Sequence, residues 1–389
     1  MFNPELFNLA SKASQYIFEK YQHTYKPSFL KKDATLKNYL KNISTLLTGV
    51  TQVHAATGQK QAQPKKTYKA ITWNLERGKN LGAIIKSLKE HMALADADFI
   101  LLTEVDWGMI RTNNLNITLE IAKAVDYHAY FAPSFFNLSR GHGSAEADME
   151  GQNLYGLHGK AILSRYPLEN LRSLALPNLT NPLRKKEPRI GYKNVLLSEY
   201  DNVTFACVHL DCYSSPRSRT RQMRTLIKSL ANTKRALIAG DWNTNTHNTT
   251  HAAGLFLSVT KQLIQGPQRA VQKKYAHTQK YYDKPLFKFL AKHQFDIDTF
   301  NEIGASTFDL YIDAEELGDM AKDRMPQVFL KMLNRLIKHC GGHIPLKLDW
   351  FAGRGLTAQN AKVIKLPKEY HDNNHPPSDH HPVIVEFTT

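Results

Sequence analysis

Cysteine is scarce in this 389-residue sequence, long apolar runs are missing, and no segment repeats at a fixed period. The cysteines are Cys207, Cys212 and Cys340; they form no CxxC pair, and their odd number cannot close a full disulfide framework. No apolar run approaches the ~18 residues of a membrane span, and no early segment has the clean apolar stretch of a signal peptide. The missing repeat argues against a solenoid. We therefore expect a cytoplasmic protein without a transmembrane segment.

The overall composition is that of an ordinary globular protein. Hydrophobic residues make up 42% of the chain, charged residues 22% and aromatic residues 10%. These values exclude a mostly disordered, collagen-like or coiled-coil chain. The length allows one large α/β domain with additions, or two domains.

The net charge of +16 favours polyanionic partners, but the positive charge is unevenly distributed. Residues 1–69 contain eleven lysines, no arginine and three acidic residues. The remaining residues are only mildly basic. Global charge is therefore a weak argument about the substrate.

The N-terminal segment is predicted to be partly helical. Asn3-Pro4-Glu5 is a typical helix start, and apolar residues follow at helical spacing up to Tyr21. Its lysines permit contact with an anionic membrane surface or nucleic acid, although we favour a solvated helical extension that packs on the main domain. Residues 55–66 are polar and include Gly58 and Pro64, which is typical of a linker. We therefore divide the chain into a basic extension with linker, 1–66, and a main domain, 67–389.

Strand-like and helix-like segments alternate along the main domain, which predicts an α/β fold. The clearest predicted strands are Tyr68–Trp73, Phe99–Thr103, Ala161–Ser164, Val195–Glu199, Val203–Val208, Ala236–Ala239, Pro345–Leu348 and Val383–Phe387. The predicted helices are Leu81–His91, Asn116–Val125, Arg217–Leu230, Pro285–His293 and Pro326–Ile337.

Polar residues recur where these predicted strands end. They are Asn74, Glu104, His209, Asp241, Asn243 and Asp349, together with Asp379 and His380 before the last strand. Each alone has an ordinary structural interpretation, such as a turn cap or a salt-bridged carboxylate. Their shared location favours a catalytic site, because a rigid sheet positions side chains at its edge while the loops leave room for a substrate.

This set of residue types suits phosphate chemistry. Carboxylates without paired cysteines are typical ligands of a hard cation such as Mg²⁺, which needs few protein ligands and keeps waters for exchange. Histidine and asparagine beside the cation are suited to hydrogen bonds with phosphoryl oxygens.

Seven short motifs carry a family resemblance. In chain order they are Thr72-Trp73-Asn74, Leu102-Thr103-Glu104-Val105, Gly159–Pro167, Val208-His209-Leu210, Gly240-Asp241-Trp242-Asn243, Leu348-Asp349-Trp350 and Ser378-Asp379-His380-His381-Pro382. Each is weak evidence alone, but their order is specific. The segment from near Thr67 to the C-terminus resembles the endonuclease/exonuclease/phosphatase superfamily, in particular its deoxyribonuclease I-like and exonuclease III-like members.

The resemblance implies a four-layered α/β/β/α sandwich of two mixed β-sheets flanked by helices. It also implies a Mg²⁺ cofactor, for which Mn²⁺ substitutes, with Glu104 as the principal metal ligand and Asn74 beside it. By the same resemblance, Asp241 orients or deprotonates the attacking water, and Asn243 holds a phosphate oxygen.

The resemblance also assigns roles to the remaining polar residues. His380 contacts the phosphate, and Asp379 fixes its tautomer and orientation. Asp349 pairs with a histidine or helps to protonate the leaving oxygen, and His209 lies beside the phosphate.

Several cations are candidate substrate contacts. Lys160 and Arg165 lie in the Gly159–Pro167 motif. Arg217 is the first cation of the stretch from Ser214 to Arg235, which is rich in arginine and lysine and has no acidic residue. This stretch fits a nucleic-acid backbone or an anionic lipid surface, and equally a solvated helix face.

We therefore expect a Mg²⁺-dependent hydrolase of phosphodiester bonds, a nuclease that acts on DNA or RNA by in-line attack of an activated water. The alternative is a phosphodiesterase or phosphatase that acts on a phospholipid, as a sphingomyelinase does, or on a small phosphorylated molecule. A third hypothesis, a binding protein that has lost catalysis, is disfavoured because the candidate catalytic residues are all present.

Overall fold

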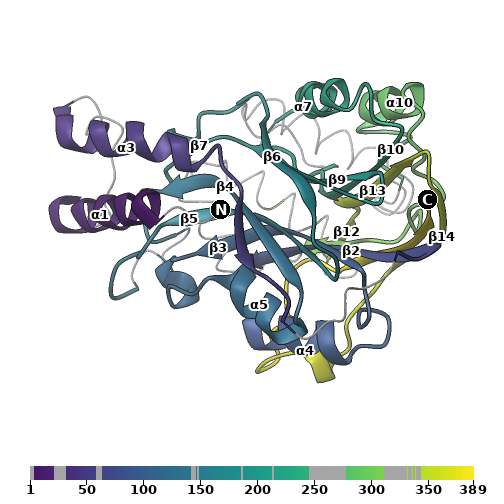
Figure 1. Cartoon of the computed structure of the whole chain (residues 1–389), viewed down its shortest axis with the longest axis horizontal. Coiled ribbons are helices and arrows are strands. Elements are labelled where there is room, and N and C mark those ends of the chain that lie inside the picture. Colours follow the sequence, from purple (N-terminus) through teal and green to yellow (C-terminus); the bar gives the residue numbers. More distant parts are fainter. Residues whose placement is uncertain are drawn as a thin grey trace.

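A computed structural model describes the chain at residues 4–21, 32–57, 64–141, 146, 149–184, 187–212, 214–244, 277–310, 331, 335, 338 and 343–389. The described residues form two large β-sheets with helices on their outer faces (Figure 1). The predicted helix Pro326–Ile337 lies almost entirely outside the described residues.

The larger sheet has eight strands and is mixed. In spatial order its strands are β1 (Thr51–His54), β4 (His128–Asn137), β5 (Leu157–Ser164), β3 (Phe99–Trp107), β2 (Thr67–Arg77), β15 (Val383–Thr388) and β14 (Thr357–Val363), and β7 (Arg189–Gly191) pairs with β4. Strands β2 and β3 run parallel, and their neighbours β15 and β5 run antiparallel to them. The carboxyl ends of β2 and β3 therefore lie at the same edge.

The smaller sheet has five strands and is also mixed. Its order is β13 (Asp349–Arg354), β10 (Arg235–Asp241), β9 (Val203–His209), β8 (Asn194–Tyr200) and β6 (Glu169–Ala175). Here β9 and β10 are the parallel pair. A separate short ribbon pairs β11 (Phe308–Leu310) with β12 (Ile344–Leu346).

Helices cover the outer face of each sheet. The larger sheet is covered by α1 (Pro4–Tyr21), α3 (Ala34–Leu46), α4 (Leu81–Glu90) and α5 (Ile117–Val125). The smaller sheet is covered by α7 (Pro216–Ser229) and α10 (Lys284–Lys292), which lie on the side of the molecule opposite α4 and α5 (Figure 1). The predicted four-layered α/β/β/α sandwich is confirmed. No helix among the described residues combines the length and apolarity needed to cross a bilayer.

The alternation of side chains along each central strand explains the layers. On β2, Tyr68 and Ala70 face the second sheet, whereas Ile71 and Trp73 face the covering helices, and all four are buried. Successive residues of a strand point to opposite faces, so an apolar run of this kind belongs to a strand covered on both sides. The central strands are therefore read from the sequence more easily than the edge strands.

The N-terminal segment packs on the larger sheet. Phe7 of α1 contacts the ring of Trp107 at a centroid distance of 4.3 Å, and Leu36 of α3 is fully buried in the same core. Strand β1 extends the sheet by pairing with β4. Part of the segment that was predicted as extension and linker thus contributes apolar surface and a strand to the main core.

The boundaries of three predicted strands differ in the structure. Strand β2 continues to Arg77 and β3 to Trp107, so Asn74 and Glu104 lie within strands, each beside an irregularity of the pairing. The predicted strand Pro345–Leu348 is observed as β12, which ends at Leu346, and Asp349 begins β13 instead of following a strand. Bulges cause such errors because they interrupt the period-two pattern that reveals a strand.

Lys160 lies between the two sheets and is 1% exposed. Its Nζ donates hydrogen bonds to Ser134 Oγ at 2.8 Å and to Asn194 Oδ1. Burial lowers the pKa of Lys160 to about 7, because the charged form loses its hydration. The predicted substrate contact is therefore not available to Lys160 in this position, where its side chain has almost no exposed surface.

We predict that Lys160→Met changes the pH dependence of stability. Between about pH 7 and pH 10 the unfolded chain holds a proton on Lys160 that the folded chain lacks, so this residue makes the free energy of unfolding rise with pH. Its contribution is about 1 kcal/mol per pH unit. Urea denaturation at several pH values should show that the advantage of Lys160→Met over wild type is largest near pH 7 and shrinks toward pH 10. A difference that is constant with pH would contradict this, and Lys123→Met, on the outer helix α5, is the control.

We predict that Gly240→Ala destabilises the protein strongly. Gly240 has φ +137°, and a Cβ there would lie 1.9 Å from the Val208 carbonyl oxygen of the neighbouring strand. Urea denaturation should show a loss of about 3 kcal/mol or more. The matched control is Gly82→Ala in α4, where a Cβ meets nothing within 4 Å, and it should be neutral or stabilising by up to about 1 kcal/mol. Equal effects of the two substitutions would contradict the account.

Candidate active site

The pairing of the strands brings the predicted polar residues to one edge of the sandwich. In the smaller sheet, Asp241 at the end of β10 is paired with His209 on β9 and with Asp349 on β13. In the larger sheet, Asn74 on β2 is paired with Thr103, next to Glu104. The two sheets thus present their functional ends side by side.

Two of these residues have left-handed backbone conformations. Glu104 has φ 51° and lies at the bulge of β3, and Asn243 has φ 50° just after β10. Such a conformation is uncommon for residues other than glycine, asparagine and aspartate. At Glu104 it accompanies the break in strand pairing that takes the side chain out of the regular alternation.

Glu104, His209 and Asp241 form a group that can hold a metal ion. One ligand atom from each lies within 4.8 Å of the others. His209 Nε2 is 3.9 Å from Glu104 Oε1 and 3.6 Å from Asp241 Oδ2. Asn74 Nδ2 donates to Asp241 Oδ2 at 3.0 Å, so the second predicted metal residue adjoins the same group.

Glu104 and His209 have opposite electrostatic surroundings. Burial opposes ionisation of Glu104, but the cationic Arg77 outweighs it, and the pKa of Glu104 lies well below its usual value. Burial and the neighbouring Lys193 hold the pKa of His209 well below its usual value. Glu104 is therefore an anion and His209 a neutral imidazole at pH 7, which are the states in which both bind metal ions.

His380 and Asp349 form a buried pair beside Asp241. His380 Nδ1 lies 2.7 Å from Asp349 Oδ2. Burial opposes the charge on His380, but the carboxylates of Asp349 and Asp379 outweigh it and hold the pKa of His380 well above its usual value. His380 is thus an imidazolium at neutral pH. Asp349 Oδ1 is buried and has no hydrogen-bond partner among the described residues.

Asp241 lies between this pair and the Glu104 group. Burial and the adjacent Asp349 carboxylate raise the pKa of Asp241 to about 7. Its Oδ1 accepts a hydrogen bond from the Asn243 backbone N–H at 2.8 Å, and Asn243 Nδ2 donates to the Leu210 carbonyl. The carboxylate is thereby held on one side by the backbone and on the other by Asn74.

The role assigned to Asp379 needs correction. The His380 ring donates its Nδ1 hydrogen bond to Asp349, whereas Asp379 Oδ1 lies 3.3 Å from Ser378 Oγ. Of the two alternatives left open for Asp349, pairing with a histidine is the one observed. Asp379 acts on His380 through its charge, and burial raises the pKa of Asp379 itself to about 6.

The sequence analysis missed a buried ionic cluster next to Glu104. Arg111 donates from Nε and Nη2 to both carboxylate oxygens of Asp106, and its Nη1 donates to Glu187 at 2.8 Å. Asp106 also contacts His158 Nδ1 at 2.8 Å. Asp106 follows Glu104 by two residues, and residues two apart on a regular strand share a face. The bulge at Glu104 interrupts this alternation, so the spacing alone could not predict the cluster.

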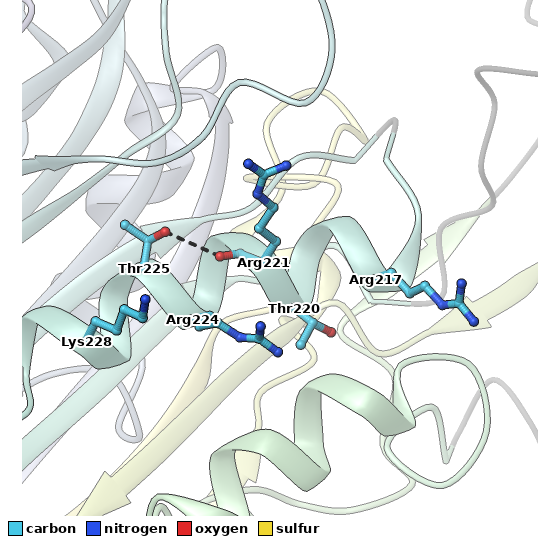
Figure 2. A pocket seen from close by; sticks show the side chains of 6 residues that line it. All are labelled: Arg217, Thr220, Arg221, Arg224, Thr225 and Lys228. Carbon is cyan, nitrogen blue, oxygen red and sulfur yellow. Dashed lines mark hydrogen bonds between the residues drawn. The ribbon is translucent and has the colours of Figure 1, made fainter.

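The predicted substrate-contacting arginines lie apart from the cluster. Arg165 follows β5 at the end that pairs with Phe99, about 16 Å along β3 from Glu104, and its guanidinium binds Asp96 at 2.7 Å. Arg217 lies near the start of α7, on the exposed face that Figure 2 shows with Arg221, Arg224 and Lys228. Arg219 of the same stretch is buried and paired with Asp283.

A family profile and several solved structures are similar to this chain. The profile of the Endonuclease/Exonuclease/phosphatase family matches residues 71–380. No curated protein sequence matches the chain. Among solved structures, the chain is similar to an endonuclease/exonuclease/phosphatase from Beutenbergia cavernae DSM 12333, with 14% identity, coverage of 83% of this chain and 72% of that chain, and a TM-score of 0.48. A 3'-5' exonuclease from Neisseria meningitidis is also similar, with 14% identity, coverage of 82% and 100%, and a TM-score of 0.45.

The matched segment runs from within β2 to His380 and therefore contains the polar residues from Asn74 to His380, as well as the described strands β3 to β14. It spans well over half of the chain. The chain therefore belongs to the Endonuclease/Exonuclease/phosphatase family and is an enzyme that hydrolyses phosphoric esters.

Proposed function

We propose that the protein is a Mg²⁺-dependent phosphodiesterase that cleaves nucleic acid by in-line attack of water. The observation that carries the proposal is the position of Asp241, which lies between the Glu104 group on one side and the His380–Asp349 pair on the other. In-line displacement needs a base and a charge stabiliser at separate places around the phosphate. Asp241 and His380 supply them.

The donor set fits a hard divalent cation. Glu104 and Asp241 offer carboxylate oxygens and His209 a neutral imidazole nitrogen, and no cysteine is among them. Asn74 adjoins this group through its hydrogen bond to Asp241. Oxygen-rich sets with few carboxylates are typical of Mg²⁺ and accept Mn²⁺. A bound cation would neutralise phosphate charge and stabilise the leaving oxygen. We propose Glu104 and Asn74 as the residues that hold it.

Asp241 is suited to take a proton from the attacking water. A general base is most effective when its pKa lies near the working pH, and burial together with Asp349 raises that of Asp241 to about 7. The hydrogen bonds from Asn74 and from the Asn243 backbone fix the carboxylate, so the base is held in one orientation.

His380 is suited to stabilise charge on the phosphoryl group. Its Nδ1 faces Asp349, which leaves Nε2 as the ring atom for the substrate. The Asp349 carboxylate both orients the ring and favours its cationic form. A fixed cation that need not reorient during the reaction is an efficient stabiliser of developing negative charge.

The surface of α7 supports nucleic acid as the substrate. Arg217, Arg221, Arg224 and Lys228 are exposed and follow helical spacing, and none forms an ion pair with a carboxylate among the described residues. In the sequence the row follows β9, which ends at His209, and it extends about 16 Å along the helix. A row of unpaired cations along one helix matches a chain of phosphates.

We predict that cleavage of an oligonucleotide requires both the metal and Asp241. Purified protein with Mg²⁺ should cleave single- or double-stranded DNA or RNA, and EDTA should abolish the activity. Asp241→Asn should lower kcat by about 10³-fold, because the base is lost, while the KM changes little. The readout is the rate of product formation on a gel. Turnover confined to sphingomyelin vesicles would overturn the nucleic-acid assignment in favour of a lipid substrate.

We also predict that Asp349→Asn lowers kcat by about 10²- to 10⁴-fold, because His380 loses its orientation and its charge. The matched control is Asp309→Asn. Asp309 contacts the neighbouring histidine, His381, at 3.3 Å, outside the catalytic group. Steady-state kinetics on one oligonucleotide should show the control within about threefold of wild type. Similar losses in both variants would indicate a structural effect and contradict the role of Asp349.

A further inference from the structure

A small cavity with two cations lies beside the candidate active site. Arg189 and Lys193 line it together with Phe135, Asn178, Thr180 and Asp211. Lys193 is 8% exposed, and Arg189 is partly buried. Lys193 helps to keep His209 neutral, and the proposed reaction gives Arg189 no role.

Neither cation is neutralised by an ion pair among the described residues. The Arg189 guanidinium lies 4.1 Å from the centre of the Phe135 ring. Its Nε is buried and has no hydrogen-bond partner among the residues that the structure describes. The one carboxylate that lines the cavity, Asp211, accepts a hydrogen bond from Thr180 Oγ1 at 2.7 Å. Buried cations are normally paired, so the buried Lys193 and the partly buried Arg189 at one cavity indicate an anionic ligand.

The strands place this cavity next to the metal group. Arg189 on β7 pairs with Asn137 on β4, and Lys193 precedes β8, which pairs with the end of β9 near His209. Lys193 interacts electrostatically with two residues of the metal group. It contributes to the low pKa of His209, and the Glu104 carboxylate acts on Lys193 itself. A ligand in the cavity would thus lie beside a phosphate held at Glu104.

We propose that Arg189 and Lys193 form a subsite for the phosphate group next to the scissile phosphodiester of a nucleic-acid strand. This inference rests on the proposed function, and it deepens that function because it names a determinant of substrate choice. A phospholipid of the sphingomyelin type has a single phosphate and leaves the subsite empty. A nucleic-acid strand, which carries a phosphate at every linkage, fills it.

The test compares substrates that differ by one phosphate. TpT contains only the scissile phosphodiester, whereas pTpT and TpTp carry one more phosphate on the 5' or the 3' side. The wild-type enzyme should cleave one of the two phosphorylated dinucleotides with a kcat/KM at least tenfold higher than that for TpT. Arg189→Met should remove most of this preference and leave the kcat/KM for TpT within about twofold of wild type. Lys193→Met should remove the preference as well, measured as the ratio of the kcat/KM for the phosphorylated dinucleotide to that for TpT, because Lys193 also acts on His209.

The controls separate this inference from the proposed function. Lys123→Met, an exposed substitution on α5, should keep the full preference for the additional phosphate. Lys193→Met should fold, because replacing an unpaired buried cation with an apolar side chain is rarely destabilising, and its melting curve checks this. Wild-type cleavage of TpT without any preference, or equal losses on all three substrates in the variants, would overturn the subsite alone. Absence of Mg²⁺-dependent cleavage of all three by wild type would overturn the proposed function.

Discussion

The hydrogen bond from Asn74 Nδ2 to Asp241 Oδ2 joins the two sheets at the catalytic edge, and the arrangement of the site depends on it. Asn74 belongs to the larger sheet and Asp241 to the smaller, and both are almost fully buried. The same strand anchors the loop before β15, because Trp73 Nε1 donates to the His380 carbonyl and Ser378 Oγ donates to the Asn74 carbonyl. Charged groups from opposite sheets are thereby held within a few ångströms of one another, an arrangement that neither sheet provides alone.

Charge is distributed around this link in a way that separates the chemical roles. Glu104 is kept anionic by Arg77, His209 is kept neutral by burial and Lys193, and His380 is kept cationic by Asp349 and Asp379. Two histidines in one site therefore hold opposite protonation states at the same pH, because their neighbours differ in sign. Between them Asp241 has a pKa near neutrality, which suits a group that takes up and releases a proton.

Sequence reasoning predicted the layered fold and the edge where the polar residues gather, since central strands such as β3 and β10 are continuous apolar runs that end in functional residues. It failed where the pattern is interrupted or where partners are distant in sequence. Asp349 was expected after a strand but begins one, and its pairing with His380 cannot be read from spacing alone. Lys160 and Arg165 lie in one recognisable motif but in different places of the fold. Lys160 is buried at the sheet interface, because successive residues of a strand point to opposite faces. Arg165 follows the end of β5 that lies away from the site, because a strand is extended.

The central claim is that the group around Glu104 holds the divalent cation while His380 and Asp349 remain free of it. The most direct measurement is a crystal structure of the protein soaked in Mn²⁺, with an anomalous difference map calculated at the manganese edge. The account predicts a peak bound by Glu104, with Asn74 beside it, and a His380–Asp349 hydrogen bond that stays intact. A peak coordinated by the second acidic group, Asp241, Asp349 and His380, or no peak at Glu104 under saturating Mn²⁺, would contradict it.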